Sequence, residues 1–350
     1  MSEQLITLLY QKLKQFKDPF SGHLFDTSNN NVNIVCKDGH ASITININPK
    51  NKEGYEHLII DIKKNLMSIK DLLSINIVLT SEKVTPPSSP TIENKETRFQ
   101  VNSKNIIAIA SGKGGVGKST FAVNFAVALK KIGKKVGILD ADIYGPSVPR
   151  MMGISGRPQA NENNKLIPLE SYGIKCMSIG FLIGVDTPTI WRGPMVMKAL
   201  EQMFNGVEWG ELDFLIIDMP PGTGDAQLTL AQSSKLSGSI IVSTPQDVAL
   251  IDARKGINMF KRVEVPVLGI VENMSYFICS NCEERHEIFS NGGAKKEAEK
   301  FQTNFLGELP IDINLRIQSD EGRPVCISEP ESDIAKIYIK IAEKVSADLQ

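Results

Sequence analysis

The sequence lacks the features that mark secreted, membrane-spanning and nucleic-acid-binding chains. It has only five cysteines in 350 residues, and an odd number in a chain of this length does not suggest a disulfide framework. No apolar run approaches the roughly 18 residues of a transmembrane helix, so we expect no membrane association. The formal net charge is −1, which provides no overall basic field for a nucleic-acid partner. We therefore expect a protein of the reducing cytoplasm.

The length and an apolar content of 41% allow about two domains with sizeable cores. Residues 1–82 predict a small α+β domain, because helical spacing and strand alternation follow each other in the order αββαβ. Residues 83–103 combine prolines with polar residues and are interpreted as a flexible linker. The main domain is expected over residues 104–350. In the small domain we expect helices at 2–16 and 55–69 and strands at 32–36, 43–47 and 75–79.

Apolar strands alternate with helical segments in the main domain. This alternation predicts an α/β fold with a doubly wound, mostly parallel sheet. The expected strands are 105–110, 135–140, 213–218, 238–243, 266–272 and 305–309. The expected helices lie near 119–132, 194–204, 225–235, 246–262, 293–302 and 332–348.

A phosphate-binding loop is the most specific pattern in the chain. Residues 112–119 fit G-x-x-x-x-G-K-[ST], between the apolar run Ile106–Ala110 and a helix-forming stretch that starts at Phe121. This order of strand, glycine-rich loop and helix aims backbone N–H groups and a helix N-terminus at phosphates. Lys118 would reach the β- and γ-phosphates of ATP, and Ser119 would bind Mg²⁺. The residues expected to hold the nucleotide are Gly112, Lys113, Gly114, Gly115, Val116, Gly117, Lys118, Ser119 and Thr120.

Two acidic residues end apolar strands of the main domain. Asp140 ends the strand at 135–140 and should point into the crevice where such sheets bind ligands. Asp218 ends Phe214–Ile217, which is a Walker B pattern, and would lie in the Mg²⁺ shell. Asp142 follows two residues after Asp140, where a helix cap or turn residue is one interpretation.

Cys279 and Cys282 form a CxxC pair. The spacing alone fits a redox pair, half a zinc site or half a cluster site, and the last two need about four ligands. His286 lies nearby, so a mixed site within one chain is conceivable. Two copies of the chain related by two-fold symmetry would instead supply four thiolates. Cys36 and Cys176 lie in strand-like segments and are interpreted as structural.

These motifs together resemble those of the Mrp/ApbC iron–sulfur cluster carrier family, within the MinD/ParA group of deviant Walker A ATPases. The resemblance covers about residues 104–345. In addition, the small domain with Asp18-Pro19 after its first helix resembles the MIP18-type domain that precedes Mrp ATPase domains. The motifs that recur in order are 112–119, 140–147, Trp191–Met195, 218–225, 273–276 with the CxxC pair, and Gly322–Pro324.

The resemblance implies an ATPase that holds a [4Fe–4S] cluster bridging two subunits of a homodimer. The cluster would be ligated by Cys279 and Cys282 and passed to recipient apoproteins, and the cluster assembly machinery would be a further partner. The extra lysine of this group, here Lys113, crosses the dimer interface and touches the nucleotide of the other subunit. By the same resemblance, Asp140 lies near Mg²⁺ and Asp142 near the attacking water.

The resemblance also places Asn273 against the adenine ring, and a structural turn is the other interpretation of this residue. The longer cytosolic relatives carry an extra N-terminal four-cysteine motif, which this sequence lacks, so we expect no second stable cluster.

Two other functions compete with a cluster carrier. A MinD/ParA-like positioning ATPase binds membrane or DNA and would need a basic amphipathic C-terminal helix or a basic patch. The last predicted helix is instead mixed in charge. A nucleotide switch stabilised by zinc would use the CxxC pair without a cluster. Metal analysis of anaerobically purified protein separates the carrier from the zinc switch.

Overall fold

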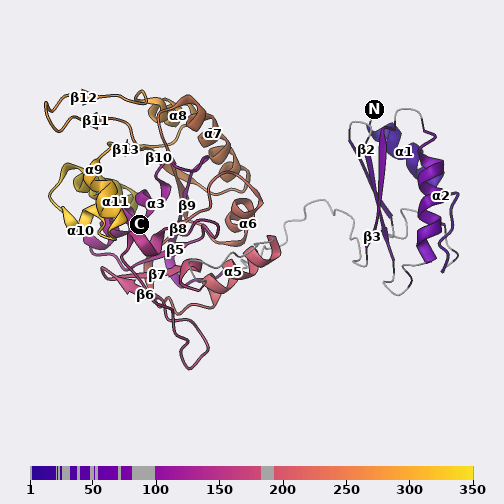
Figure 1. Ribbon diagram of the computed structural model, residues 1–350, viewed down its shortest axis with the longest axis horizontal. Helices are drawn as coiled ribbons and strands as arrows, with labels where there is room; N and C mark the ends of the chain where they lie inside the picture. Colours follow the sequence, from indigo (N-terminus) through magenta and orange to yellow (C-terminus); the bar gives the residue numbers. More distant parts are fainter. Residues whose placement is uncertain are drawn as a thin grey trace. The chain divides into compact units, whose positions relative to one another are not determined.

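The computed structural model describes residues 2–20, 22, 24–25, 32–37, 40–47, 51, 54–69, 72–80, 99–182 and 193–349. The chain divides into two compact units, Met1–Lys95 and Glu96–Gln350 (Figure 1), and each has its own buried apolar core. The predicted linker at 83–103 lies outside the described residues up to position 98. Phe99 already belongs to the second unit, because it is buried and bridges to Ser234.

The small unit has the predicted αββαβ order. Strand β2 pairs antiparallel with β1 and parallel with β3. Leu9 and Leu13 of the first helix and Ile43 and Ile45 of the central strand are fully buried, which is the face pattern expected of an amphipathic helix on a sheet. The elements are α1 (Ser2–Leu13), β1 (Val32–Lys37), β2 (His40–Asn46), α2 (Glu56–Leu66) and β3 (Ser74–Thr80).

An eight-stranded sheet forms the centre of the second unit, in the order β13-β10-β9-β4-β8-β5-β7-β6. The pairs are parallel except β6 with β7, which confirms the predicted doubly wound, mostly parallel α/β fold. The strands are β4 (Ser103–Ala110), β5 (Val136–Asp140), β6 (Leu169–Ser171), β7 (Ile174–Ser178), β8 (Leu212–Asp218), β9 (Gly238–Ser243), β10 (Val267–Glu272) and β13 (Phe305–Glu308).

The helices of this unit connect and cover the strands (Figure 1). None of the helices in the described ranges is long and apolar enough to cross a bilayer. The helices are α3 (Lys118–Lys131), α4 (Val148–Met151), α5 (Gly193–Asn205), α6 (Asp225–Ser233), α7 (Asp247–Arg262), α8 (Gly293–Phe301), α9 (Ile313–Asp320), α10 (Val325–Ser328) and α11 (Asp333–Asp348).

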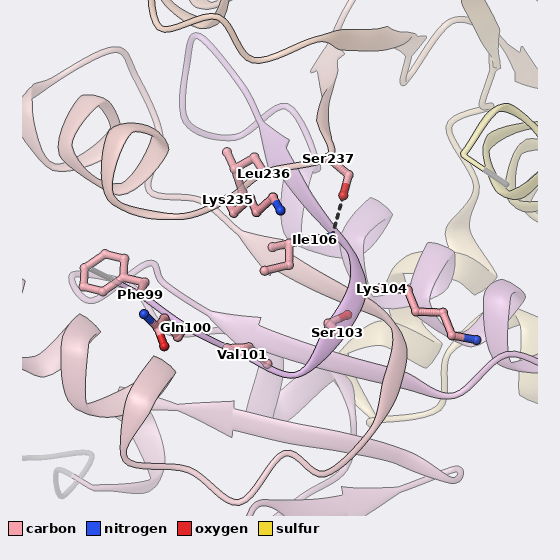
Figure 2. A pocket seen from close by; sticks show the side chains of 9 residues that line it. All are labelled: Phe99, Gln100, Val101, Ser103, Lys104, Ile106, Lys235, Leu236 and Ser237. Atoms are coloured by element: carbon pink, nitrogen blue, oxygen red, sulfur yellow. Dashed lines mark hydrogen bonds between the residues drawn. The ribbon is translucent and has the colours of Figure 1, made fainter. Parts of the chain in front are cut away.

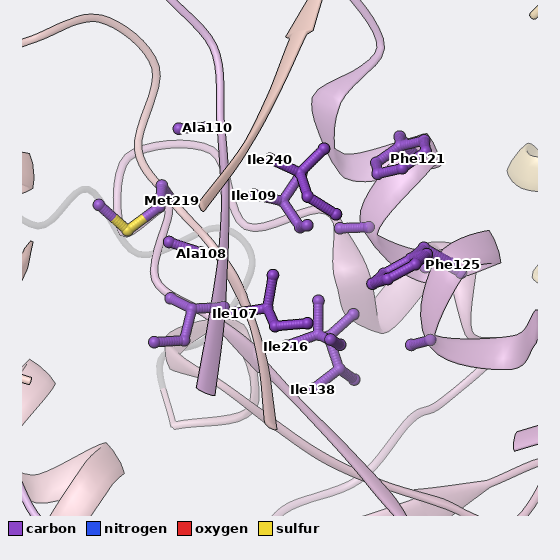
Figure 3. Close-up of a cluster of buried hydrophobic side chains, with 14 of the residues drawn as sticks. Ile107, Ala108, Ile109, Ala110, Phe121, Phe125, Ile138, Ile216, Met219 and Ile240 are labelled. Carbon is purple, nitrogen blue, oxygen red and sulfur yellow. The ribbon is translucent and has the colours of Figure 1, made fainter. Parts of the chain in front are cut away.

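The core packs α3 firmly on the strand that precedes it. Phe121 and Phe125 lie on one face of α3, next to the isoleucines of the central strands, and all are fully buried (Figure 3). Burying each such ring contributes about 1.5–3 kcal/mol. This packing fixes both ends of the loop between β4 and α3. Because neighbouring parallel strands end at the same edge, residues after β4, β5, β8 and β10 meet beside that loop.

Candidate nucleotide site and thiol hairpin

The nucleotide loop touches neighbouring elements at both of its ends. A side chain at Gly112 would collide with the backbone of Asp252 in α7, so this helix packs directly on the loop. Gly117 has a φ of +82° and is the N-cap of α3. A side chain there would collide with the Asn273 amide, and its left-handed backbone also favours glycine. The loop is therefore held by α7 on one side and by the residue after β10 on the other.

Asn273 braces this loop. Its Nδ2 donates to the carbonyl oxygen of Val116 at 2.8 Å, and the side chain is buried. In this structure the amide thus contacts the loop backbone, and contact with the adenine ring stays a prediction.

Lys118 lies among the groups predicted to surround phosphate and metal. It is only 5% exposed, and its Nζ is 2.6 Å from Asp218 Oδ1. The same ammonium is 3.2 Å from Ser119 Oγ and 3.9 Å from Asp142 Oδ2. The structure therefore brings three predicted residues, Ser119, Asp142 and Asp218, together around the Lys118 ammonium group.

Asp140 and Asp218 form a fully buried acidic pair. They are register partners at the ends of β5 and β8. The Ser178 hydroxyl and the backbone N–H of Val148 donate to Asp140 Oδ2 at 3.0 and 3.2 Å. Burial raises the pKa of Asp140, and the charge of Asp218 raises it further. With both acids ionised beside one lysine, the site would carry excess negative charge, which a bound cation would balance.

The donor set suits Mg²⁺. Asp218 Oδ2 is buried and has no hydrogen-bond partner among the described residues. A buried carboxylate oxygen without a partner is costly, and a hard cation bound by carboxylate and hydroxyl oxygens would satisfy it. Asp140, Asp218 and Ser119 therefore fit the metal position that the sequence predicts.

Asp142 lines a cavity of about 420 Å³, together with Pro220 and Pro221. Backbone N–H groups of Tyr144 and Gly145 donate to the Asp142 carboxylate, as a turn residue requires, and burial raises its pKa. Its position is compatible with both interpretations made from the sequence, and the water-orienting role stays a prediction.

Lys113 contrasts with Lys118. Its side chain is exposed, and no carboxylate of the described residues pairs with it. Its backbone is fixed, because the Ser111 hydroxyl donates to the Lys113 carbonyl at 2.9 Å. The loop therefore presents one lysine to its own acids and one to solvent.

Cys279 and Cys282 lie in the turn of a short hairpin of β11 (Phe277–Ile278) and β12 (Arg285–His286). Figure 1 shows this hairpin extending from the edge of the second unit. Backbone N–H groups of Asn281 and Cys282 donate to the Cys279 sulfur, as does the Cys282 thiol, and these hydrogen bonds lower the pKa of Cys279. Of the five free cysteines, Cys279 and Cys282 are accessible to solvent, whereas Cys36, Cys176 and Cys326 are buried.

A buried carboxylate at the end of β10 binds the segments that flank the hairpin. Glu272 is fully buried at the end of β10, and its oxygens accept from the backbone N–H groups of Gly292 and Ala294 at 2.9 and 2.7 Å. The Ser275 hydroxyl lies 2.7 Å from Glu272 Oε1 and 2.9 Å from Glu308 Oε2. These contacts join the end of β10, the start of α8 and the end of β13.

Glu308 carries the connection on to the hairpin. Its Oε2 accepts from Asn291 Nδ2 at 2.9 Å and from Arg285 Nη2 at 3.1 Å. The Arg285 guanidinium also lies 3.9 Å from the centre of the Tyr276 ring. Polar contacts thus run from Glu272 through Ser275 and Glu308 to the strand that follows the CxxC pair, and Glu272 is the chain neighbour of Asn273, which braces the nucleotide loop.

Sequence reasoning did not single out this polar chain. Glu272 gave a usable signal, because it is a charged residue at the end of an apolar strand. Glu308 and Arg285 gave no signal in the sequence, because the ion pair between them depends on how β13 and the hairpin are placed in space.

A second cavity, of about 280 Å³, lies at the amino end of β4 (Figure 2). Phe99, Lys104 and Leu236 are among the residues that line it. The nucleotide loop follows the other end of β4, and none of the predicted site residues lines this cavity. It is separate from the nucleotide site.

The fold and the loop together define a P-loop NTPase with the second lysine of the MinD/ParA class. The comparison with protein families identifies the branch: the family model described as NUBPL iron-transfer P-loop NTPase matches residues 102–346. The chain belongs to this family, which confirms the resemblance noted from its motifs.

Relatives of the chain agree with this assignment. It is 54% identical over 265 residues to an Arabidopsis thaliana protein named iron-sulfur protein required for NADH dehydrogenase, mitochondrial, covering 75% of this chain and 85% of that protein. It is 56% identical over 247 residues to the iron-sulfur cluster carrier protein of Escherichia coli K12, covering 70% of this chain and 67% of that protein.

Solved structures show the same fold. A nucleotide-binding protein of Archaeoglobus fulgidus, solved with ADP and with cobalt detected, is 43% identical with a TM-score of 0.59, covering 68% of this chain and 93% of that one. The cell division ATPase MinD of Pyrococcus furiosus is 23% identical with a TM-score of 0.53, covering 70% and 99%, and supports the fold alone.

Proposed function

We propose that this protein is an ATP-binding and ATP-hydrolysing iron–sulfur cluster carrier. Two copies would hold one [4Fe–4S] cluster between their CxxC pairs and pass it to recipient apoproteins. The observation that carries this proposal is an accessible, hydrogen-bonded thiol pair on the same unit as a P-loop. The names of relatives that are 54–56% identical support it.

The cluster is cargo in this proposal, and four thiolates are the ligand set that suits it. Each chain offers two accessible thiols close together, so a two-fold axis would supply the other two. The buried cysteines cannot contribute without unfolding their surroundings. Partners are therefore a second copy of the chain, the machinery that loads the cluster, and the apoproteins that receive it.

Weak ATP hydrolysis would rest on positioning and charge. The loop N–H groups from Gly112 to Thr120 would hold the phosphates, and Lys118 would leave Asp218 for the β- and γ-phosphates. Asp142 would orient the attacking water, and Lys113 would contact the nucleotide of the other subunit. Mg²⁺, held by Ser119, Asp140 and Asp218, would supply charge stabilisation at the phosphates.

The same proposal extends to the small unit and the compartment. Residues 1–82 would be a partner-docking module of MIP18 type, in keeping with their αββαβ order. A reducing compartment such as the cytoplasm suits five cysteines that are all free thiols.

Anaerobic reconstitution with ferrous iron and sulfide tests the carrier function. We expect four irons and four sulfides per dimer, read by iron and sulfide analysis and by native mass spectrometry. Cys279→Ala and Cys282→Ala should each abolish cluster binding and transfer, whereas Cys36→Ala, Cys176→Ala and Cys326→Ala should retain both. A cluster in the Cys279/Cys282 double variant, or four irons on a monomer, would contradict the proposal. Zinc after anaerobic purification together with no cluster uptake on reconstitution would favour the switch without a cluster.

A further inference from the structure

We propose that the β11–β12 hairpin of a single chain is also a mononuclear site for one borderline divalent cation of the ferrous or zinc type. Its ligands are Cys282, Glu284 and His286, with Cys279 as the fourth. This site is distinct from a cluster shared between two copies, because it needs one chain and uses a carboxylate and an imidazole that the cluster does not require.

The donor atoms already converge. One donor atom from each of Cys282, Glu284 and His286 can be chosen so that all three lie within 4.8 Å of one another, and His286 Nε2 lies 3.9 Å from Glu284 Oε2. Ligands held at about 2.0–2.3 Å from one tetrahedral ion lie about 3.3–3.8 Å apart. All three side chains are exposed, so small rotations about their side-chain bonds can close the remaining ångström.

The backbone explains why these residues meet. Glu284 comes directly before β12 and His286 ends it, and side chains two positions apart in an extended segment share a face. Phe277 pairs with His286, while the N–H of Cys279 donates to the Glu284 carbonyl at 3.0 Å and closes the turn. The N–H of Glu283 donates back to the Cys279 carbonyl at 2.9 Å. The turn is thus fixed by backbone hydrogen bonds before any ion binds.

Cys279 completes the set. Its sulfur accepts from the backbone N–H groups of Asn281 and Cys282 and from the Cys282 thiol, so the two sulfurs are adjacent. The resulting donors are two sulfurs, one imidazole nitrogen and one carboxylate oxygen, a set suited to zinc and ferrous iron and not to magnesium or calcium.

The site has a consequence for cluster handling. Both thiols that would face a second copy are ligands of the single ion. An ion held in one chain and a cluster bridging two chains therefore exclude each other, and the hairpin would exchange between the two occupancies.

Cobalt(II) is the probe, because its visible absorption reports tetrahedral geometry and its thiolate charge-transfer bands report sulfur ligation. The full chain is titrated anaerobically with excess Mg²⁺ and ADP present to occupy the nucleotide loop, and its mass is measured at the end point. We expect one cobalt per chain on a monomer. His286→Ala and Glu284→Gln should each weaken binding at least as much as the ~10–100-fold that loss of an outer partner costs. Glu283→Gln and Glu287→Gln are the matched controls and should bind as the unaltered chain.

Cluster reconstitution on the same variants separates this proposal from the carrier function. We expect His286→Ala and Glu284→Gln to take up the bridging cluster normally, and the Cys279/Cys282 double variant to lose both cobalt and cluster. Unaltered cobalt affinity in His286→Ala and Glu284→Gln, or half a cobalt per chain on a dimer, overturns the mononuclear site. Loss of cluster uptake by the unaltered chain with one cobalt per monomer retained overturns the carrier function and leaves this site standing.

Discussion

The two lysines of the nucleotide loop differ in their surroundings although they lie five positions apart. Lys118 is buried against Asp218, and Lys113 is exposed with its backbone fixed by Ser111. A buried lysine beside two acids can bind a phosphate in place of a carboxylate. An exposed lysine on a rigid loop can bind a group from another molecule.

Replacing Lys118 by Ala should reduce ATP turnover by about 10²–10³-fold, because one preorganised charge at the phosphates is lost. The change also leaves the buried Asp218 carboxylate without its partner, so thermal unfolding must be recorded beside a phosphate-release assay. Lys104→Ala is the control, since Lys104 is exposed and pairs with Asp213 at the other end of β4. Unchanged turnover in a folded Lys118→Ala protein would disprove the assignment of the loop.

Asp142→Asn should separate binding from hydrolysis. The amide keeps the size of the side chain but cannot take a proton from water, so turnover should fall by about 10²-fold or more while ATP affinity stays within about twofold. Single-turnover hydrolysis and equilibrium nucleotide binding measure the two quantities. If both match the unaltered protein, Asp142 serves only to cap its turn, where Tyr144 and Gly145 donate to it.

At the scale of elements, the long strands and helices of the main domain are predictable, whereas β6, β7, α4, α9, α10 and the hairpin are not among the expected elements. The six strands and six helices expected in the main domain are all present, because continuous apolar runs and helical spacing decide them locally. β11 and β12 have only two residues each, and their pairing depends on turn contacts around Cys279 that no periodicity reveals. The residues of the nucleotide site and of the thiol hairpin likewise include some that the sequence predicts and some that it does not.

The motif residues could be predicted from the sequence, because Lys118 has a fixed place in the loop pattern after a strand, and Asp140 and Asp218 end apolar strands. The contact of α7 with Gly112 and the chain from Glu272 to Arg285 could not, since they join segments distant in sequence.

The Glu308 anchor should make the stability of the hairpin region depend on pH. Burial alone would raise the pKa of Glu308, but hydrogen bonds from Asn291, Ser275 and Arg285 outweigh it and hold the pKa below its usual range. The stabilisation is therefore present above the ordinary glutamate pKa and is lost as the pH falls through the lowered value.

Glu308→Gln should consequently lower the free energy of unfolding at pH 7, and its difference from the unaltered protein should shrink below about pH 4. Urea unfolding at a series of pH values measures this. Glu299→Gln, on the exposed side of α8, should show no such difference. A pH-independent effect of Glu308→Gln would mean that the carboxylate charge does not anchor the hairpin.

At the scale of the whole molecule, the contacts join the two sites within one unit. Asn273 braces the nucleotide loop, its neighbour Glu272 binds the start of α8, and Glu308 reaches Arg285 on the hairpin. We therefore expect that a rearrangement of the nucleotide loop around phosphates changes the contacts at the base of the thiol hairpin. The small unit has its own buried core.

Lys113→Ala should remove nucleotide-dependent pairing of two chains while leaving nucleotide binding by each chain intact. The exposed ammonium has no carboxylate partner among the described residues, and in the proposed dimer it would gain a phosphate of the other subunit. A hydrogen bond to a charged group contributes about 1.5–3 kcal/mol, so the dimer dissociation constant should rise by about tenfold to hundredfold. Light scattering over a range of protein concentrations, with Mg²⁺ and a non-hydrolysable ATP analogue, measures it. Lys104→Ala again serves as the exposed-lysine control and should dimerise normally. If Lys113→Ala dimerises as the unaltered chain does, then the second lysine does not reach across, and pairing of the two CxxC hairpins must be driven by another surface.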